Sequence, residues 1–279
     1  MKKTLLLFAL LSCAATGFAQ VKGKPVSFTT QDGWNIAAVY AAPEKGQKTA
    51  LLLHDLGKSH RDFAAFTDRL AQRGIGYLAL DLRGHGQSVN KGVYAAFAKE
   101  GVDNDFNKMV RDVNAAMDFL KGKGIAEEEV VFVGAGLGAN VAAKAASLWP
   151  GVGGLALLTP VTNARDVLTI PALRVYKGQV FIAAAADDKK TFLEASVLRN
   201  VAFLTSGEGQ VTFATAYDKK GHELLDAWTA PELVQWLQTP QKPEINPDIV
   251  ETPAEDPAAV YEPVAPSDTE DALFPSVLQ

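Results

Sequence analysis

The sequence has little cysteine, little histidine and no excess of basic residues. Cys13 is the only cysteine among 279 residues, which excludes a disulfide within the chain. The histidines number four, and His54 and His60 are too loosely spaced, with no cysteine or acid cluster, to indicate a zinc site. Lysine and arginine (27) are outnumbered by aspartate and glutamate (32), so no basic patch for nucleic acid is expected. The sequence therefore predicts no metal ion and no nucleic-acid partner.

The N-terminus has the features of a secretory signal. Two lysines follow Met1, residues 5–11 form an apolar run too short to span a bilayer, and small residues lead to Ala19. We predict a signal peptide over residues 1–19 and export to the periplasm or the medium, with no membrane span. The stretch ending at Cys13 also resembles a lipobox, so a lipid anchor at Cys13 remains an alternative.

The C-terminal segment differs from the rest in composition. Residues 239–279 carry eight of the 14 prolines and nine acidic residues against one lysine. Such a segment cannot bury enough apolar surface to offset chain entropy, so we predict a disordered acidic tail. Its role is either to solvate the protein or to dock a partner. The remaining 20–238, which is nearly neutral, is predicted to form one domain with a core, since 48% of the whole chain is hydrophobic.

Strand-like and helix-like patterns alternate along this body. Apolar residues at helical spacing, including Phe63, Phe66 and Leu70, distinguish the helices from short apolar strands. The predicted strands span 26–30, 36–41, 50–53, 76–82, 130–133, 155–158, 180–184 and 211–216, and the predicted helices 61–73, 106–120, 139–149, 190–198 and 223–237. The first two strands flank Asp32-Gly33 and predict a hairpin. The alternation predicts an α/β fold with a mostly parallel eight-stranded sheet flanked by helices on both faces.

Four motifs follow predicted strands. They are His54-Asp55-Leu56-Gly57, the run from Asp81 to Ser88, Gly134-Ala135-Gly136-Leu137-Gly138, and Asp187-Asp188 followed later by Gly221-His222. In order and spacing they resemble the α/β-hydrolase superfamily, in its dienelactone-hydrolase-like or serine-aminopeptidase-like branch. The resemblance covers nearly all of the body. It implies the α/β-hydrolase fold, here with little or no cap domain, because only residues 160–178 lie where many members insert one.

The resemblance also implies a site. The nucleophile of the family stands on a tight turn between small residues, here Gly134 and Gly138, which places its position at Gly136. The backbone N–H groups of Leu56 and Leu137 would form the oxyanion hole. Asp188, with Asp187 as the fallback, would be the acid, and His222 the base.

Glycine at position 136 removes the nucleophile. It has no side chain to deprotonate or acylate, so the Asp188–His222 pair would have nothing to activate. It also relieves the strained backbone conformation of such a turn. The sequence therefore favours a noncatalytic or strongly impaired hydrolase relative that binds a small-molecule ligand or a protein partner. If the rest of the site is intact, Gly136→Ser should create esterase activity.

Other readings remain open. An active ester or peptide hydrolase could use Ser59 or water activated by His222, whereas Ser88 fits a structural role in its turn. A third hypothesis is an envelope interaction protein acting through the acidic tail. The glycines from Gly134 to Gly138 also fit a dinucleotide-binding turn, but the acidic residue expected about 20 positions later is absent, so no cofactor is expected.

Overall fold

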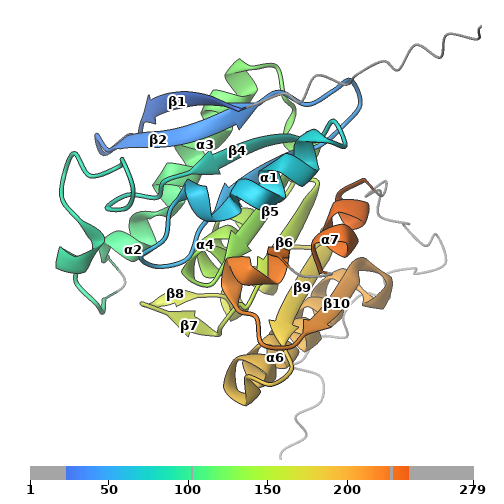
Figure 1. The fold of residues 1–279 in the computed structure, drawn as a ribbon. Coiled ribbons are helices and arrows are strands. Elements are labelled where there is room, and N and C mark those ends of the chain that lie inside the picture. The colour runs from blue at the N-terminus through green and yellow to red at the C-terminus, as the bar shows by residue number, and fades with distance from the viewer. Residues whose placement is uncertain (1–22, 102, 227–228, 239–279) are drawn as a thin grey trace, which may run out of the picture. The chain divides into compact units, whose positions relative to one another are not determined.

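The computed structural model describes residues 23–101, 103–226 and 229–238 (Figure 1). The predicted signal peptide, with Cys13, and the predicted acidic tail lie outside the described residues. In the part of the chain that is described, no helix combines the length and apolarity needed to cross a membrane.

An eight-stranded sheet forms the centre of the fold, as predicted. Its strands are β1 (Lys24–Thr29), β2 (Asn35–Ala41), β3 (Thr49–Leu53), β4 (Gly76–Leu80), β5 (Val130–Ala135), β6 (Gly154–Leu158), β9 (Val180–Ala185) and β10 (Val211–Ala216). They lie in the order β1-β2-β4-β3-β5-β6-β9-β10. β1 and β2 form the predicted antiparallel hairpin, β2 is antiparallel to β4, and the remaining pairs are parallel. The carboxyl ends of the parallel strands therefore meet at one edge, where ligands bind in such sheets.

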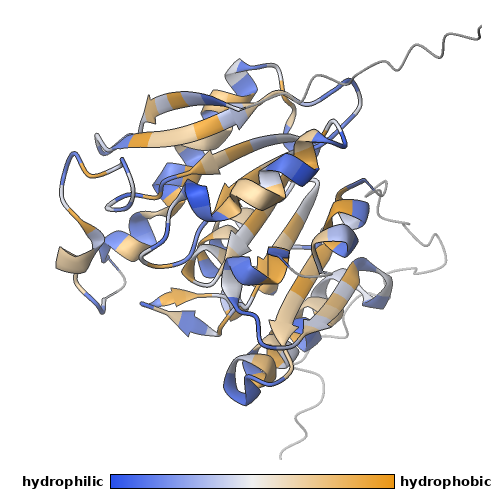
Figure 2. Cartoon of the chain, in the orientation of Figure 1, coloured by the Kyte–Doolittle hydropathy of each residue, from blue (hydrophilic) through white to orange (hydrophobic). Residues whose placement is uncertain are grey.

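Helices cover both faces of the sheet. α1 (Ala64–Ala71) and α7 (Thr229–Gln238) pack on one face, and α3 (Val110–Gly122), α4 (Leu137–Ala146) and α6 (Lys189–Ser206) pack on the other. β3, β4, β5, β6 and β9 are buried along their whole length, as expected for parallel strands covered on both sides. Figure 2 shows the result, with hydrophobic residues along the strands and hydrophilic residues on the outward side of α1.

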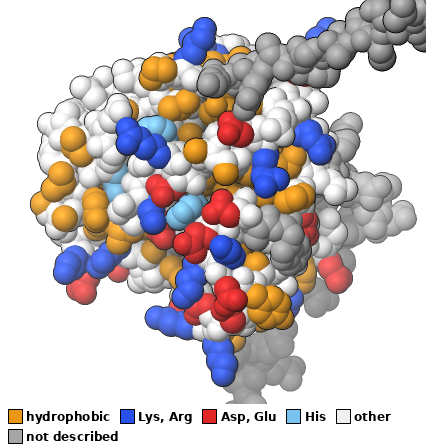
Figure 3. All heavy atoms as spheres, viewed as in Figure 1, with side chains coloured by type: hydrophobic (Ala, Val, Ile, Leu, Met, Phe, Trp, Pro, Cys, Tyr) orange, Lys and Arg blue, Asp and Glu red, His pale blue; other side chains and the backbone are white. Residues whose placement is uncertain are grey.

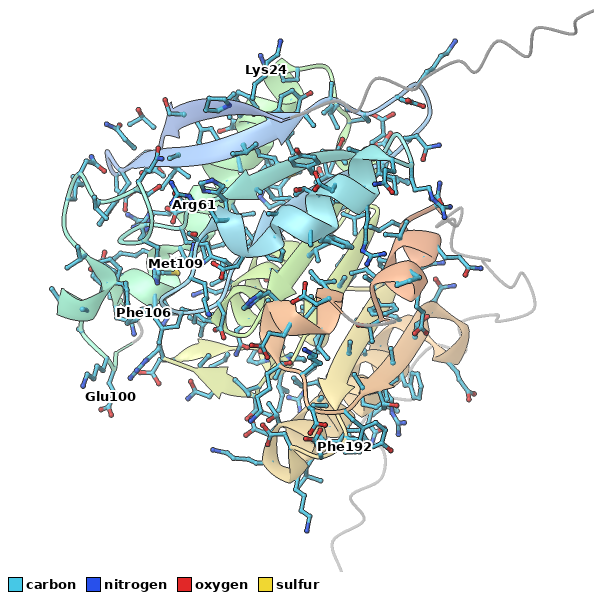
Figure 4. All side chains as sticks on the ribbon, in the orientation of Figure 1. Lys24, Arg61, Glu100, Phe106, Met109 and Phe192 are labelled. Atoms are coloured by element: carbon cyan, nitrogen blue, oxygen red, sulfur yellow. The ribbon has the colours of Figure 1, made fainter. Side chains whose placement is uncertain are left out.

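All five predicted helices differ in their limits from the observed ones, and three of them show how. The expected helix over 106–120 is divided into α2 (Asp105–Lys108), which Asn104 caps, and α3, with Phe106 and Met109 near the junction (Figure 4). The expected helix over 223–237 consists of a 3₁₀ turn, η5 (Gly221–Asp226), and the separate helix α7. Pro231 falls in the first turn of α7, where proline is tolerated, rather than in a helix interior. The helix predicted at 190–198 continues to Ser206.

The segment between β6 and β9 is short, in agreement with the predicted absence of a large cap. It contains a two-stranded hairpin, β7 (Asn163–Ala164) with β8 (Val167–Leu168), and one helical turn, α5 (Ile170–Leu173). Asn140 on α4 holds it in place, because its side-chain amide donates to the carbonyl oxygens of Val161 and Val167 at 2.9 and 2.8 Å. The segment between β6 and β9 therefore consists of a small hairpin and one helical turn rather than a lid domain.

Candidate active site

The turn between β5 and α4 has the shape of a nucleophile elbow. Gly136 lies at its tip with φ 53° and ψ −120°, a conformation that residues with a side chain rarely adopt. Its N–H donates to the carbonyl oxygen of Leu158 at 2.9 Å. A Cβ atom on Gly134 would lie 2.2 Å from the carbonyl oxygen of Gly138, and one on Gly138 would lie 2.2 Å from that of Leu53. Glycine is therefore required at both flanking positions by close backbone packing, which is the physical reason behind the small residues of the motif.

The carboxylate of Asp55 fills the space in front of this turn. Asp55 follows β3, and its Oδ1 accepts a hydrogen bond from the N–H of Leu56 at 2.7 Å and from the N–H of Leu137 at 2.8 Å. A Cβ atom on Gly136 would lie 2.1 Å from Cγ and from Oδ1 of Asp55. The Asp55 side chain thus lies where the nucleophile side chain would be. It also accepts hydrogen bonds from both backbone donors.

The two N–H groups predicted for the oxyanion hole therefore point at one oxygen atom. Leu137 is the first residue of α4, so its N–H carries the partial positive charge of a helix N-terminus, and Leu56 contributes the second donor from the loop after β3. Hydrogen bonds from N–H groups to a carboxylate are stronger than those between neutral groups. The arrangement is suited to binding a negatively charged oxygen, and the chain supplies that oxygen itself.

His54 fixes the backbone of Asp55. The His54 ring is fully buried, its Nε2 accepts from the N–H of Leu82 at 3.0 Å, and its Nδ1 therefore donates to the carbonyl oxygen of Asp55 at 2.7 Å. Burial lowers the pKa of His54 to about 4, which keeps the ring neutral and preserves this tautomer. His54 therefore orders the loop that carries Asp55.

The predicted base and acid have other partners. His222 lies in η5 with its side chain 16% exposed, and its Nε2 is 3.7 Å from Oδ1 of Asp62. Asp188 caps α6 by accepting from the N–H of Thr191, and its Oδ2 is 2.7 Å from Nζ of Lys220. The hydrogen bond from Lys220, supported by Thr191, lowers the pKa of Asp188 to about 2.

Asp187, the fallback acid, accepts a hydrogen bond from the N–H of Asp218 at 3.0 Å. The structure thus brings Gly136, Leu56 and Leu137 together, and it pairs His222 with Asp62 rather than with either residue of the Asp187-Asp188 motif. The catalytic pairing of Asp188 with His222 stays a prediction.

The two serines considered as nucleophiles both serve turns. Ser88 is buried, donates its hydroxyl to the carbonyl oxygen of Asp81 at 2.7 Å and accepts from the N–H of Ala37 at 2.9 Å. Ser59 caps the 3₁₀ turn η1 (His60–Phe63) by accepting from the N–H of Arg61, the residue labelled in Figure 4. These bonds are those of structural hydroxyl groups.

A second histidine and aspartate pair, His60 with Asp81, lies at the carboxyl end of β4. Asp81, at the end of β4, accepts from the N–H and from Nδ1 of His60, at 2.8 and 2.7 Å, and from the N–H of Gln87 at 2.8 Å. This pairing was not predicted from the sequence. Charged side chains of both signs and histidines reach the surface on the face drawn in Figure 3. No group of three or more metal-binding side chains occurs among residues 23–101, 103–226 and 229–238.

Asp55 is a site residue that the sequence did not identify, as is Asp62, the partner of His222. Asp55 was part of the quoted motif after β3, yet no role was assigned to it. The sequence feature that could have identified it is an aspartate directly beside the loop predicted to bind an oxyanion, in a chain whose elbow has no nucleophile side chain.

Comparisons with known proteins agree with this fold. The model of the family described as serine aminopeptidase, S33, matches residues 44–238. An esterase of Pyrococcus furiosus superposes with a TM-score of 0.64 at 16% identity, covering 80% of this chain and 94% of that one. The esterase Est1E of Butyrivibrio proteoclasticus, solved with ferulic acid, gives 0.59 at 14% identity, covering 76% and 96%. The search of curated proteins found no match. At these identities the structural likeness establishes the fold alone.

Proposed function

Because the chain belongs to the serine aminopeptidase S33 family of α/β-hydrolase-fold proteins, we propose that it is a noncatalytic or strongly impaired member that binds a ligand or a partner. The observation that carries this proposal is the carboxylate of Asp55 lying against Gly136 on both backbone donors. The site has the family's backbone frame without the atom that attacks.

Two separate steps of acyl transfer are missing from this arrangement. Covalent catalysis needs a hydroxyl, thiol or carboxylate at the elbow, and Gly136 provides none, so His222 has no group there to deprotonate. Stabilisation of the tetrahedral intermediate needs the N–H groups of Leu56 and Leu137, and Asp55 already uses both.

The second loss is as important as the first. Serine hydrolases from which a triad residue has been removed retain roughly 10³–10⁴-fold catalysis over water, owing to the oxyanion hole and substrate binding. A substrate carbonyl oxygen can reach that hole here only after the Asp55 side chain leaves it. The residual activity is therefore expected to be lower than in a hydrolase that lacks only its serine.

A serine-directed fluorophosphonate probe tests the proposal. The purified mature chain should remain unlabelled and should hydrolyse 4-nitrophenyl acetate no faster than its His222→Ala variant. A serine esterase treated in parallel provides the positive control. Labelling of any serine near the elbow, or turnover that His222→Ala abolishes, would favour the alternative of an active hydrolase with another nucleophile or with water activated by His222.

The proposal includes export, on the strength of the sequence of residues 1–19. Expression of the full chain in a bacterium, followed by fractionation and mass spectrometry, should give a soluble periplasmic or secreted protein that begins at Gln20. A lipidated N-terminus at Cys13 would instead establish the anchored form. Deletion of residues 239–279 tests the envelope-interaction hypothesis, because loss of partner capture with unchanged melting would assign the interaction to the tail.

A further inference from the structure

Two N–H groups that are far apart in sequence converge on a single carboxylate oxygen. Leu56 and Leu137 come from the loop after β3 and from the start of α4, and both donate to Oδ1 of Asp55 at 2.7 and 2.8 Å. Neither N–H belongs to a strand ladder or to the hydrogen bonds inside a helix, since the first N–H groups of a helix have no partner within it. The pair therefore forms a built anion site, and an anion already occupies it.

We infer that Asp55 is the resident ligand of this site: a tethered carboxylate that closes the oxyanion donors to external carboxylates and to carbonyl substrates. The inference rests on the proposed function, because a chain that turned over esters would have to release Asp55 from the donors. It extends that proposal, because the oxyanion donors are closed by a side chain of the protein itself.

The backbone around Asp55 holds the carboxylate in place. The Asp55 carbonyl oxygen accepts from Nδ1 of the buried His54 and from the N–H of Lys58 at 3.1 Å. With the backbone fixed in this way, the carboxylate can leave the donors only by rotation of its own side chain. Gly136 leaves the space that the carboxylate fills, because any Cβ at that position would overlap it.

Removal of the tethered carboxylate should leave a vacant anion site. In Asp55→Ala the backbone contacts of residue 55 are retained, and the N–H groups of Leu56 and Leu137 lose their acceptor. An external carboxylate can then make the same two hydrogen bonds, aided by the N-terminus of α4. Asp62→Asn is the matched control, because Asp62 is a nearby carboxylate that faces His222 and the N–H of Ser59, and its removal changes the net charge equally.

The experiment is a titration with phenylacetate, followed by the amide NMR signals of Leu56 and Leu137. Asp55→Ala should show saturable shifts of both signals, with an affinity at least about tenfold higher than that of the wild type or of Asp62→Asn. Benzyl alcohol, the neutral analogue, should produce no such shifts. Equal binding by the wild type, or no gain in Asp55→Ala relative to Asp62→Asn, would overturn the inference.

A second measurement applies even if Asp55→Ala does not fold. In the wild-type chain the Leu56 and Leu137 amides should exchange slowly with solvent, and in Asp55→Asn both should exchange roughly tenfold faster, because a neutral acceptor holds an N–H less strongly than a carboxylate. Unprotected amides in the wild type would refute the closure. These outcomes are separate from the fluorophosphonate result. A labelled serine would overturn the proposed function, whereas the phenylacetate titration alone decides whether Asp55 closes the two N–H groups.

Discussion

A serine at position 136 and the carboxylate of Asp55 cannot occupy the same space, and a pair of substitutions tests this. Gly136→Ser alone places a Cβ atom 2.1 Å from Cγ and Oδ1 of Asp55, so the carboxylate must leave the N–H groups of Leu56 and Leu137. In Gly136→Ser combined with Asp55→Ala that overlap is absent. The sequence alone suggested that the serine by itself would create activity. In the structure the serine must first displace the Asp55 carboxylate, and Asp55→Ala removes the cost of that displacement.

The magnitude follows from two costs. A residue other than glycine at φ 53° and ψ −120° is strained by about 1–3 kcal/mol. Displacement of Asp55 costs part of two hydrogen bonds to a charged group, each of which contributes about 1.5–3 kcal/mol. We expect Gly136→Ser to lower the free energy of unfolding by about 3–5 kcal/mol in the wild-type background and by about 1–3 kcal/mol in the Asp55→Ala background. The difference is the coupling energy between the two positions.

Urea unfolding of the four chains in this cycle measures the coupling, and hydrolysis of 4-nitrophenyl acetate measures the chemistry. The double variant should hydrolyse the ester faster than Gly136→Ser, and His222→Ala should reduce that rate by roughly 10²-fold or more. The reasoning is refuted if Gly136→Ser costs the same in both backgrounds and hydrolyses the ester as fast as the double variant.

Three further predictions concern charge and burial. Asp112→Ala should destabilise the fold by about 3–5 kcal/mol, because it leaves the buried Arg83 without the carboxylate that lies 2.7 Å from Nη2. Asp103→Ala, which removes an exposed ion pair with Lys108, should change stability by less than about 1 kcal/mol in the same urea assay. The pKa of Asp188 is lowered to about 2, so its contribution to stability is present above pH 4 and lost as the pH falls through 2; the stability difference between the wild type and Asp188→Asn should shrink over that range. The pKa of His54 is lowered to about 4, so between pH 6.5 and 4 the unfolded chain binds a proton that the folded chain does not. The free energy of unfolding should therefore fall by on the order of 3 kcal/mol as the pH falls from 6.5 to 4 in the wild type, and not in His54→Gln.

The fold was predictable because its signals are local and repeated. Short apolar strands, helical spacing and the glycines at 134 and 138 each report on the packing of neighbouring residues, and together they specify a covered parallel sheet. The pairing of the Leu56 and Leu137 N–H groups, by contrast, was expected only because the motifs resemble those of the α/β-hydrolase superfamily. Helix limits were less predictable: the segment over 106–120 is interrupted at Met109, and Pro231 stands in the first turn of α7 rather than inside one long helix.

The charge partners in the site could not be predicted in the same way. Whether the His222 ring faces Asp62 or Asp188 depends on side-chain directions across loops that are far apart in sequence, and Lys220 competes for Asp188 at 2.7 Å. The position of Asp55 depends on contacts with α4, which begins 82 residues later. Residue type and spacing along the chain do not contain these distances.

The turn at Gly136 has the shape of a nucleophile elbow although residue 136 has no side chain. The fold therefore does not by itself indicate activity. Gly136 is free to adopt many conformations, yet it retains φ 53° and ψ −120°. The constraint comes from its surroundings, since the Gly136 N–H is bonded to the Leu158 carbonyl and the flanking Gly134 and Gly138 are packed against backbone atoms. Because the packing of β5 and α4 imposes this geometry, a turn of the same shape forms whether or not residue 136 can attack a substrate. Membership of the family therefore establishes the frame of the site, and the side chains of residues 55 and 136 decide its chemistry.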